Sequence, residues 1–169
     1  MGNMSHPASD EVDRIVGAWQ GQRPDLDFSP LEVLSRVDRL SRHLDRARKS
    51  AFRRSDLESW EWDVLSALRR AREPFQLSPK QLLQQTLVSS GTMTNRIDRL
   101  VKRGLVRREA DPDDGRSILV TLTDSGRTRV DAAITRLVDA ETELLGALSR
   151  SEQERLAGLL RKLSIGFDS

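Results

Sequence analysis

Apolar residues recur with helical spacing in long segments near both ends of the chain. Ser29-Pro30 has the form of an N-cap followed by a first-turn proline, which predicts the start of a long helix. One apolar stripe runs along this predicted helix and consists of Leu31, Leu34, Val37, Leu40 and Leu44. The stripe is too long and narrow for one small domain, so it predicts that the helix packs against a further surface.

The last third of the chain repeats this pattern. Thr123 is a predicted N-cap for a helix to about Leu148, and Ser151 with Glu154 predicts a capping box for another helix through Leu163. The apolar faces of these helices contain Leu137, Leu144, Leu145, Leu148, Leu156, Leu159, Leu160 and Leu163. Leucine surfaces at both ends predict a shared packing layer, which a homodimer buries most simply. An intramolecular bundle is the alternative.

The middle of the chain has shorter elements. Residues 56–70 have helical periodicity, and Pro74 ends this segment. Ser78-Pro79 again has the form of an N-cap and a first-turn proline, and it opens a short helix before a turn near residues 86–88. A third helix is predicted from about Ser89 to Lys102, with Gly104 as the C-terminal stop. Two short helices around a tight turn are the outline of a helix-turn-helix.

After Gly104 the apolar period changes from 3.6 to about 2. Residues 105–110 and 116–122 are predicted strands, and residues 111–115 (Asp-Pro-Asp-Asp-Gly) form a turn-rich loop between them. A plain structural hairpin fits this pattern. Its position directly after a basic helix favours a wing that lies on DNA. The fold class is therefore mainly α with a small β-hairpin wing.

A helical wheel of residues 89–103 predicts which side chains face DNA. The buried face consists of Met93, Ile97, Leu100 and Val101. The opposite face carries hydroxyl, amide and guanidinium groups, which read base edges, on Thr92, Asn95, Arg99 and Lys102. Ser89 and Ser90 are predicted at the helix N-terminus, where backbone amides meet phosphate. A solvated surface helix is the alternative.

The distribution of charged residues along the chain is more informative than the net charge. The net charge is only +2. Between residues 92 and 108, however, Asp98 is the single acidic residue among six basic ones, namely Arg96, Arg99, Lys102, Arg103, Arg107 and Arg108. Such a cluster is typical of duplex DNA binding. We expect Arg107 and Arg108 to leave opposite faces of their strand, one toward phosphate, and Arg116 to enter a minor groove with Asp114 orienting its guanidinium.

Composition excludes several classes of function. Hydrophobic residues make up 37% of the chain, and no run approaches the roughly 18 apolar residues of a membrane span. The chain has no cysteine and only two histidines, His6 and His43, so we expect no metal site, no cofactor and no enzymatic activity. No signal peptide is visible, which favours a cytoplasmic location. Residues 1–9 are predicted to be disordered, and Met4 is an alternative native start.

Several of these segments together resemble the MarR family of bacterial regulators. They are Leu77-Ser-Pro-Lys-Gln-Leu82, residues 89–106, the loop at residues 111–117 with its Asp114-Gly-Arg116 pattern, and Leu122-Thr-Asp-Ser-Gly126. The resemblance covers about residues 31–165. It implies a winged helix-turn-helix at residues 56–122 and a dimer formed by helices at residues 10–55 and 123–165. The expected function is that of a transcriptional regulator, a repressor by resemblance, on a palindromic duplex.

A narrower resemblance is to the urate-responsive branch of that family, whose members carry an extra N-terminal helix. Residues 10–20 are predicted to form such a helix here, and the positions that match the branch's ligand residues are Trp19, Asp63, Arg96 and Arg108. The resemblance implies a small anionic ligand, such as urate or another aromatic acid or carboxylate, that releases DNA. A structural ion pair of Asp63 with Arg96 or Arg108 is the alternative. Ligand-independent regulation and a winged-helix protein-interaction module are the rival functions.

Overall fold

The computed structural model describes residues 9–86, 88–112, 114 and 117–167. Within these ranges the elements are α1 (Glu11–Gln22), α2 (Ser29–Arg53), α3 (Ser59–Arg70), β1 (Gln76–Leu77), α4 (Pro79–Thr86), α5 (Ser90–Lys102), β2 (Val106–Ala110), β3 (Ile118–Leu122), α6 (Asp124–Leu144), α7 (Arg150–Ser164) and the short 3-10 helix η1 (Ile165–Phe167). The chain forms two compact units, of which one ends at Arg46 and the other begins at Ala47. The predicted disorder of residues 1–8 lies outside the described residues.

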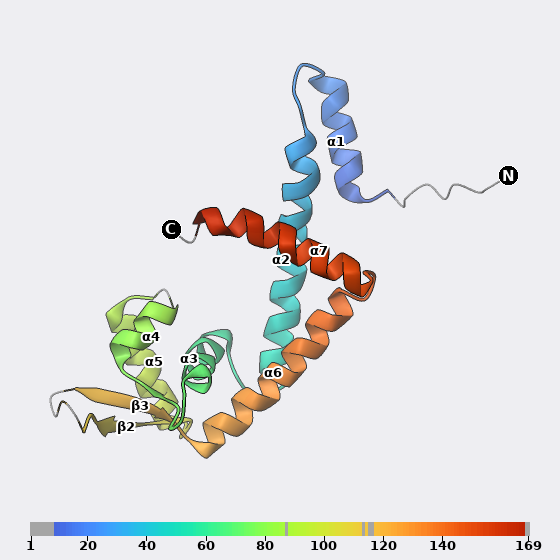
Figure 1. Ribbon diagram of the computed structural model, residues 1–169. Helices are drawn as coiled ribbons and strands as arrows, with labels where there is room; N and C mark the ends of the chain where they lie inside the picture. The colour runs from blue at the N-terminus through green and yellow to red at the C-terminus, as the bar shows by residue number, and fades with distance from the viewer. Residues whose placement is uncertain (1–8, 87, 113, 115–116, 168–169) are drawn as a thin grey trace. The chain divides into compact units, whose positions relative to one another are not determined.

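In the first unit, α1 lies alongside the first part of α2 (Figure 1). Val12 and Val16 are buried on the inner face of α1. The Arg36 guanidinium holds the two helices together through Asp10 (2.8 Å) and Asp13 (2.6 Å). Hydrogen bonding to Arg36 keeps the pKa of Asp10 below its ordinary value. The predicted N-terminal helix is confirmed, with Asp10 as its N-cap.

The second unit is built on a core under α3, α4, α5 and the sheet. Its fully buried apolar side chains include Leu65, Leu68, Leu82, Met93, Ile97, Leu100, Leu105 and Val120. α4 and α5 are the two helices of the predicted helix-turn-helix, which is confirmed. Ser78 caps α4 as predicted, because its hydroxyl accepts the Gln81 N–H at 3.3 Å.

The wing is a three-stranded antiparallel sheet in the order β1-β3-β2, where the sequence predicted only a hairpin. β2 and β3 pair as predicted, from Val106 opposite Leu122 to Ala110 opposite Ile118. The additional strand β1 has only two residues, Gln76 and Leu77, and it pairs with Thr121 and Val120. A two-residue strand carries no period of its own, so it forms only where β3 offers a free edge.

Three predicted helix boundaries are wrong, and the first is the end of α6, which lies at Leu144 rather than near Leu148. α3 begins at Ser59 rather than residue 56, because Asp56 has a positive φ of 53° and Glu58 provides the N-cap. α7 begins two residues earlier than predicted: the capping box is formed by Ser149 and Glu152, not by Ser151 and Glu154. Both pairs have the Ser-x-x-Glu spacing, and the turn that follows α6 selects the first.

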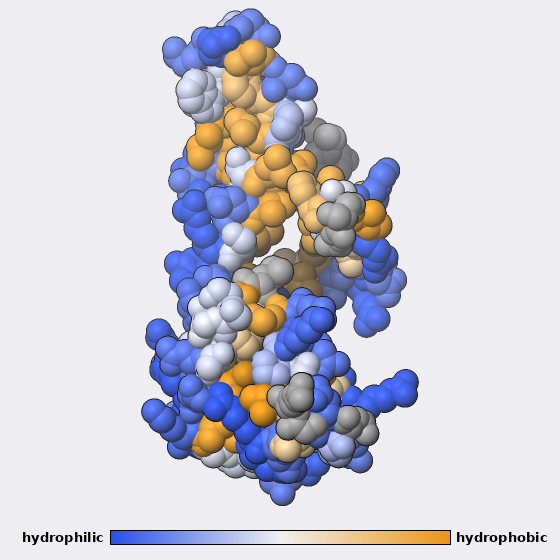
Figure 2. Space-filling view, turned by 90° about the vertical axis from the view of Figure 1, so that its left-hand side faces the viewer, coloured by the Kyte–Doolittle hydropathy of each residue, from blue (hydrophilic) through white to orange (hydrophobic). Residues whose placement is uncertain are grey.

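α6 leads away from the sheet and ends near the start of α7 (Figure 1). Thr123 caps α6 as predicted, through its Oγ1 and the Gly126 N–H at 3.0 Å. α7 has 15 residues and buries none of them. Leu159, Leu160 and Leu163 are 56%, 41% and 54% exposed. Figure 2 shows apolar side chains, in orange, that remain at the surface in this view.

Candidate DNA interface and ligand cleft

The basic helix α5 is fixed to the core by its cap and its apolar face. Ser89 is the N-cap, and its hydroxyl oxygen accepts the Thr92 N–H at 3.3 Å. Met93, Ile97 and Leu100 are each at most 1% exposed. The helix ends where Gly104 takes a φ of +66°, and the Leu105 N–H donates to the Leu100 carbonyl at 3.0 Å. The sequence therefore holds α5 with one face inward and the opposite face outward.

The outward face of α5 carries Thr92, Asn95, Arg99 and Lys102, which are all exposed, as the wheel predicted. Val101 is 38% exposed, so its predicted burial is wrong. It lies at the edge of the apolar arc, where the neighbouring elements rather than the wheel decide burial. That these exposed side chains contact DNA remains a prediction.

The two serines at the start of α5 differ in what they can offer a phosphate. The Ser89 hydroxyl is already engaged, since it also donates to Thr92 Oγ1 at 2.9 Å. Ser90 is exposed, and its carbonyl accepts the Thr94 hydroxyl at 3.1 Å. The backbone amides of the first turn, rather than the Ser89 hydroxyl, are therefore the donors that suit a phosphate.

The wing arginines point in different directions. Arg108 pairs with Asp98 of α5 at 2.7 Å, whereas Arg107 is exposed and pairs with Glu109 at 2.9 Å. Hydrogen bonds from Arg107 and from the Thr121 hydroxyl hold the pKa of Glu109 below its ordinary value. At the wing tip the Ser117 hydroxyl donates to Asp114 Oδ2 at 2.7 Å. The predicted minor-groove contact of Arg116 lies outside the described residues.

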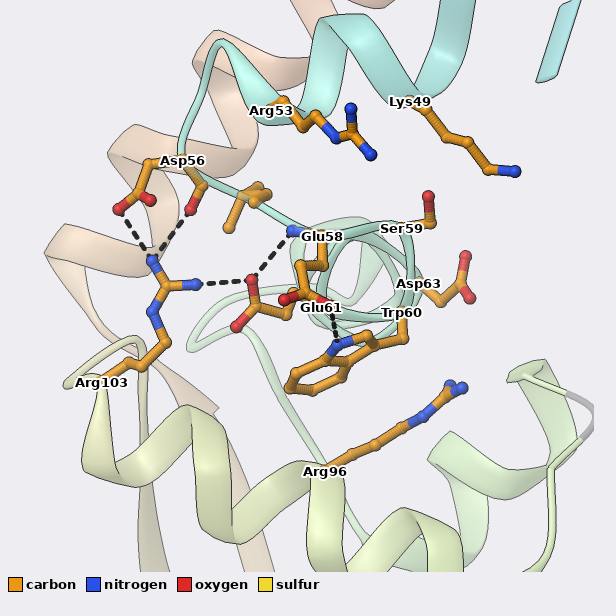
Figure 3. A pocket seen from close by; sticks show the side chains of 11 residues that line it. Lys49, Arg53, Asp56, Glu58, Ser59, Trp60, Glu61, Asp63, Arg96 and Arg103 are labelled. Atoms are coloured by element: carbon orange, nitrogen blue, oxygen red, sulfur yellow. Dashed lines mark hydrogen bonds and ion pairs between the residues drawn. The ribbon is translucent and has the colours of Figure 1, made fainter. Parts of the chain in front are cut away.

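A cleft of about 800 Å³ opens beside α5. The end of α2, the loop after it, the start of α3 and α5 form its walls (Figure 3). Its lining residues are Lys49, Arg53, Asp56, Leu57, Glu58, Ser59, Trp60, Glu61, Asp63, Arg96 and Arg103. Asp63 and Arg96, which are 33 residues apart in the chain by their numbers, reach the same opening from α3 and α5.

Arg96 is the most unusual side chain of the cleft. Its Nη1 atom is buried and has no hydrogen-bond partner, the single such side-chain atom among the described residues. The Arg96 guanidinium lies over the Trp60 ring, 5.8 Å from its centroid. A buried donor without an acceptor is unfavourable, and an anion in the cleft would satisfy it.

Asp63 does not supply that acceptor. Within the described part of the chain, no ion pair joins Asp63 to Arg96 or to Arg108. Partial removal of the Asp63 carboxyl from water raises its pKa above the ordinary value, and the positive charge of Arg96 opposes this shift. The cleft therefore contains a partly desolvated carboxyl group and an unsatisfied guanidinium.

The structure brings together two of the four predicted ligand residues. Asp63 and Arg96 line the cleft, but Arg108 is not among the lining residues and faces Asp98 instead. Trp19 belongs to the first unit, where its ring stacks on Phe28 with 6.2 Å between the centroids. Ligand roles for Arg108 and Trp19 remain predictions.

Sequence reasoning missed a charged network at the other end of the cleft. Glu61 is 1% exposed, and its carboxylate accepts Arg103 Nη1 at 2.5 Å and the Glu58 N–H at 2.9 Å. Arg103 also donates to the Asp56 carboxylate at 2.8 Å, and Arg129 of α6 pairs with the same carboxylate. The sequence analysis predicted for Arg103 only that it belongs to the basic cluster between residues 92 and 108. A buried glutamate between two tryptophans has no signal of its own in the sequence.

Comparison with known proteins identifies the family. A profile of the MarR family matches residues 55–117. Over 153 residues the chain is 35% identical to the HTH-type transcriptional regulator PecS of Dickeya dadantii, and the match covers 90% of this chain and 92% of PecS. The chain belongs to the MarR family.

Two solved structures with a similar fold are informative about function. One is a regulator bound to DNA, and the other is a regulator whose DNA binding responds to a small molecule. A mutant MarR from E. coli, complexed with operator DNA, is 27% identical with a TM-score of 0.65, and the match covers 92% of this chain and 99% of that one. BpsR of Bordetella bronchiseptica, whose DNA binding is regulated by 6-hydroxynicotinic acid, is 29% identical with a TM-score of 0.59, over 76% of this chain and 92% of BpsR.

Membership of the MarR family makes this protein a DNA-binding transcriptional regulator with a winged helix-turn-helix, and not an enzyme, as the sequence predicted. It also removes the alternative of a winged helix that serves only protein interaction. No helix in the described ranges combines the length and the apolar character that a membrane crossing requires. Among the same residues, no histidine and carboxylate cluster has an arrangement that would hold a metal ion.

Proposed function

We propose that this MarR-family regulator represses transcription as a homodimer on a palindromic operator and is released by a small anion bound in the cleft. The observation that carries the ligand part is the buried, unpartnered Nη1 of Arg96, because this side chain enters the cleft from the DNA-reading helix itself. An anion that binds Arg96 therefore contacts α5 directly.

The dimer is supported by apolar helix faces that stay exposed within each of the two compact units. α7 carries exposed leucines along its length, and α2 carries Leu34, Val37 and Leu40 at 59%, 41% and 60% exposure. Exposed apolar stripes of this length on regular helices are typical of subunit interfaces. Two α5 helices related by a twofold axis and about 34 Å apart would enter successive major grooves of an inverted repeat.

The cleft chemistry favours a planar anion as the ligand. Four basic residues line the cleft beside four carboxylates, and Arg103 is paired with Glu61 and Asp56, so the preference for an anion rests on the unsatisfied Arg96 donor, with Trp60 as an aromatic surface. Urate, suggested by the resemblance to the urate-responsive branch, and 6-hydroxynicotinic acid, which regulates BpsR, both have this form. A ligand that binds the DNA-free conformation of the dimer more favourably by only a few kcal/mol is enough to release most of the DNA. Ligand-independent regulation is the alternative.

Replacement of Arg99 by alanine should weaken operator binding about tenfold or more, with the loss concentrated at one base position, because a bidentate base contact contributes about 1–3 kcal/mol. Arg107→Ala should weaken binding to all sequences equally and reduce the salt slope by about one. Gel-shift titrations on the DNA upstream of the protein's own gene and on single-base variants measure both effects. Arg150→Ala, an exposed cation on α7, is the matched control. If Arg99→Ala and Arg107→Ala both kept full operator affinity, the prediction that α5 and the wing contact DNA would be wrong.

Urate or 6-hydroxynicotinate should raise the melting temperature of the wild-type protein and lower its operator affinity, while Arg96→Ala should lose both responses. Asp63→Asn should bind the same anion about threefold more tightly or better, because the amide removes a nearby negative charge at partial exposure. Equal stabilisation of wild type and Arg96→Ala would place the ligand elsewhere. An anion that binds without reducing operator affinity would favour the ligand-independent alternative.

A further inference from the structure

Two arginines of α5 lie over the ring of one tryptophan of α3. Arg96, which enters the cleft, is 5.8 Å from the Trp60 ring centroid, and Arg99, on the exposed DNA-reading face, is 4.5 Å from it. The two are three residues apart and therefore neighbours on the helix surface. Trp60 is thus in contact with both the ligand-side and the DNA-side cation of the same helix.

The Trp60 ring is held in a defined orientation but remains accessible. Its Nε1–H donates to Glu58 Oε2 at 2.9 Å, and the side chain is half-buried against the core. The ring also lines the cleft, so an occupant of the cleft meets it directly (Figure 3). The other tryptophan of α3, Trp62, stacks on Phe52 at 4.9 Å and does not line the cleft.

We propose that Trp60 positions Arg99 for base reading and that an anion in the cleft acts on DNA binding through this ring. An arginine restricted by stacking loses less side-chain freedom when it binds a base edge, because its planar group is already oriented. A planar anion paired with Arg96 competes for the same aromatic surface and withdraws this support. The second half of the proposal rests on the proposed function, whereas the first half does not.

The first half is tested on DNA alone with the full-length protein. Trp60→Leu should weaken operator binding about 3- to 10-fold, within the range of a cation–π contact, and Trp60→Phe should retain most of the affinity. In an Arg99→Ala background, Trp60→Leu should have no further effect, because the contact is already lost. Additive losses in the double variant would overturn the positioning role. Trp62→Phe is the matched control and should leave operator affinity unchanged.

The second half is tested by the release factor, the ratio of operator dissociation constants with and without saturating urate or 6-hydroxynicotinate. This factor should fall toward one in Trp60→Leu while the anion still raises the melting temperature of that variant. By linkage, operator DNA should lower wild-type anion affinity by the same factor. An unchanged release factor in Trp60→Leu overturns the coupling. If neither anion releases the wild-type protein from DNA, the coupling proposal for these ligands is overturned together with the ligand part of the proposed function. The operator affinities of the single and double variants at Trp60 and Arg99 still decide the positioning role.

Discussion

Replacement of Arg103 by methionine should lower the free energy of unfolding by about 3 kcal/mol, because it leaves the Glu61 carboxylate buried without its cation. The Glu61 side chain is 2% exposed, and Arg103 Nη1 lies 2.5 Å from it. The remaining donor to this carboxylate is the Glu58 N–H, which carries no net charge. Urea denaturation followed by circular dichroism measures the loss.

The double variant Arg103→Met with Glu61→Gln is the control for this prediction. A glutamine oxygen keeps the Glu58 hydrogen bond and has no charge to bury, so the double variant should recover more than half of the lost stability. If the single and double variants were equally destabilised, side-chain packing rather than the ion pair would account for the loss. Since Arg103 also joins the end of α5 to Asp56, the single variant should loosen the reading helix as well.

Replacement of Gly126 by alanine should also lower the free energy of unfolding by about 3 kcal/mol. A Cβ at this position would lie 2.1 Å from the Leu105 carbonyl oxygen and 2.9 Å from a methyl carbon of Leu122. The first of these is a backbone atom that cannot rotate away, so α6 must move from the junction between α5 and β2. Thermal unfolding measures the effect.

Gly17→Ala is the matched control for the Gly126 substitution. Gly17 lies within α1, and an added Cβ would meet nothing within 4 Å. This substitution should leave stability unchanged or raise it by up to about 1 kcal/mol, through the higher helix propensity of alanine. Wild-type stability in Gly126→Ala would show that α6 can shift at no measurable cost, which would contradict the close packing of this junction.

Local signals in the sequence were enough to predict most elements of the DNA-binding lobe. The cap at Ser89, the apolar spacing of Met93, Ile97 and Leu100, and the stop at Gly104 each act within a few residues, so α5 and its exposed face were predictable. The strands β2 and β3 were predictable from their period of two. The errors at Val101 and at the capping box of α7 arose where two readings fit the same local pattern.

The candidate cleft was predictable only in part. The family resemblance indicated Asp63 and Arg96, but it did not distinguish an ion pair between them from separate groups in one opening. Arg108 was assigned to the same site, and its pairing with Asp98 follows from the register of β2 beside α5, which no residue spacing specifies.

What the sequence determined by itself is the set of helices, the reading face of α5 and the hairpin, because caps and periodicity depend on neighbours in the chain. Tertiary structure alone decided that Glu61 is buried against Arg103, that Trp60 lies beneath Arg96 and Arg99, and that Arg96 has an unsatisfied donor. Partner choice between charged and aromatic side chains depends on distances of a few ångströms between elements that lie far apart in sequence, and on the loss of water around them.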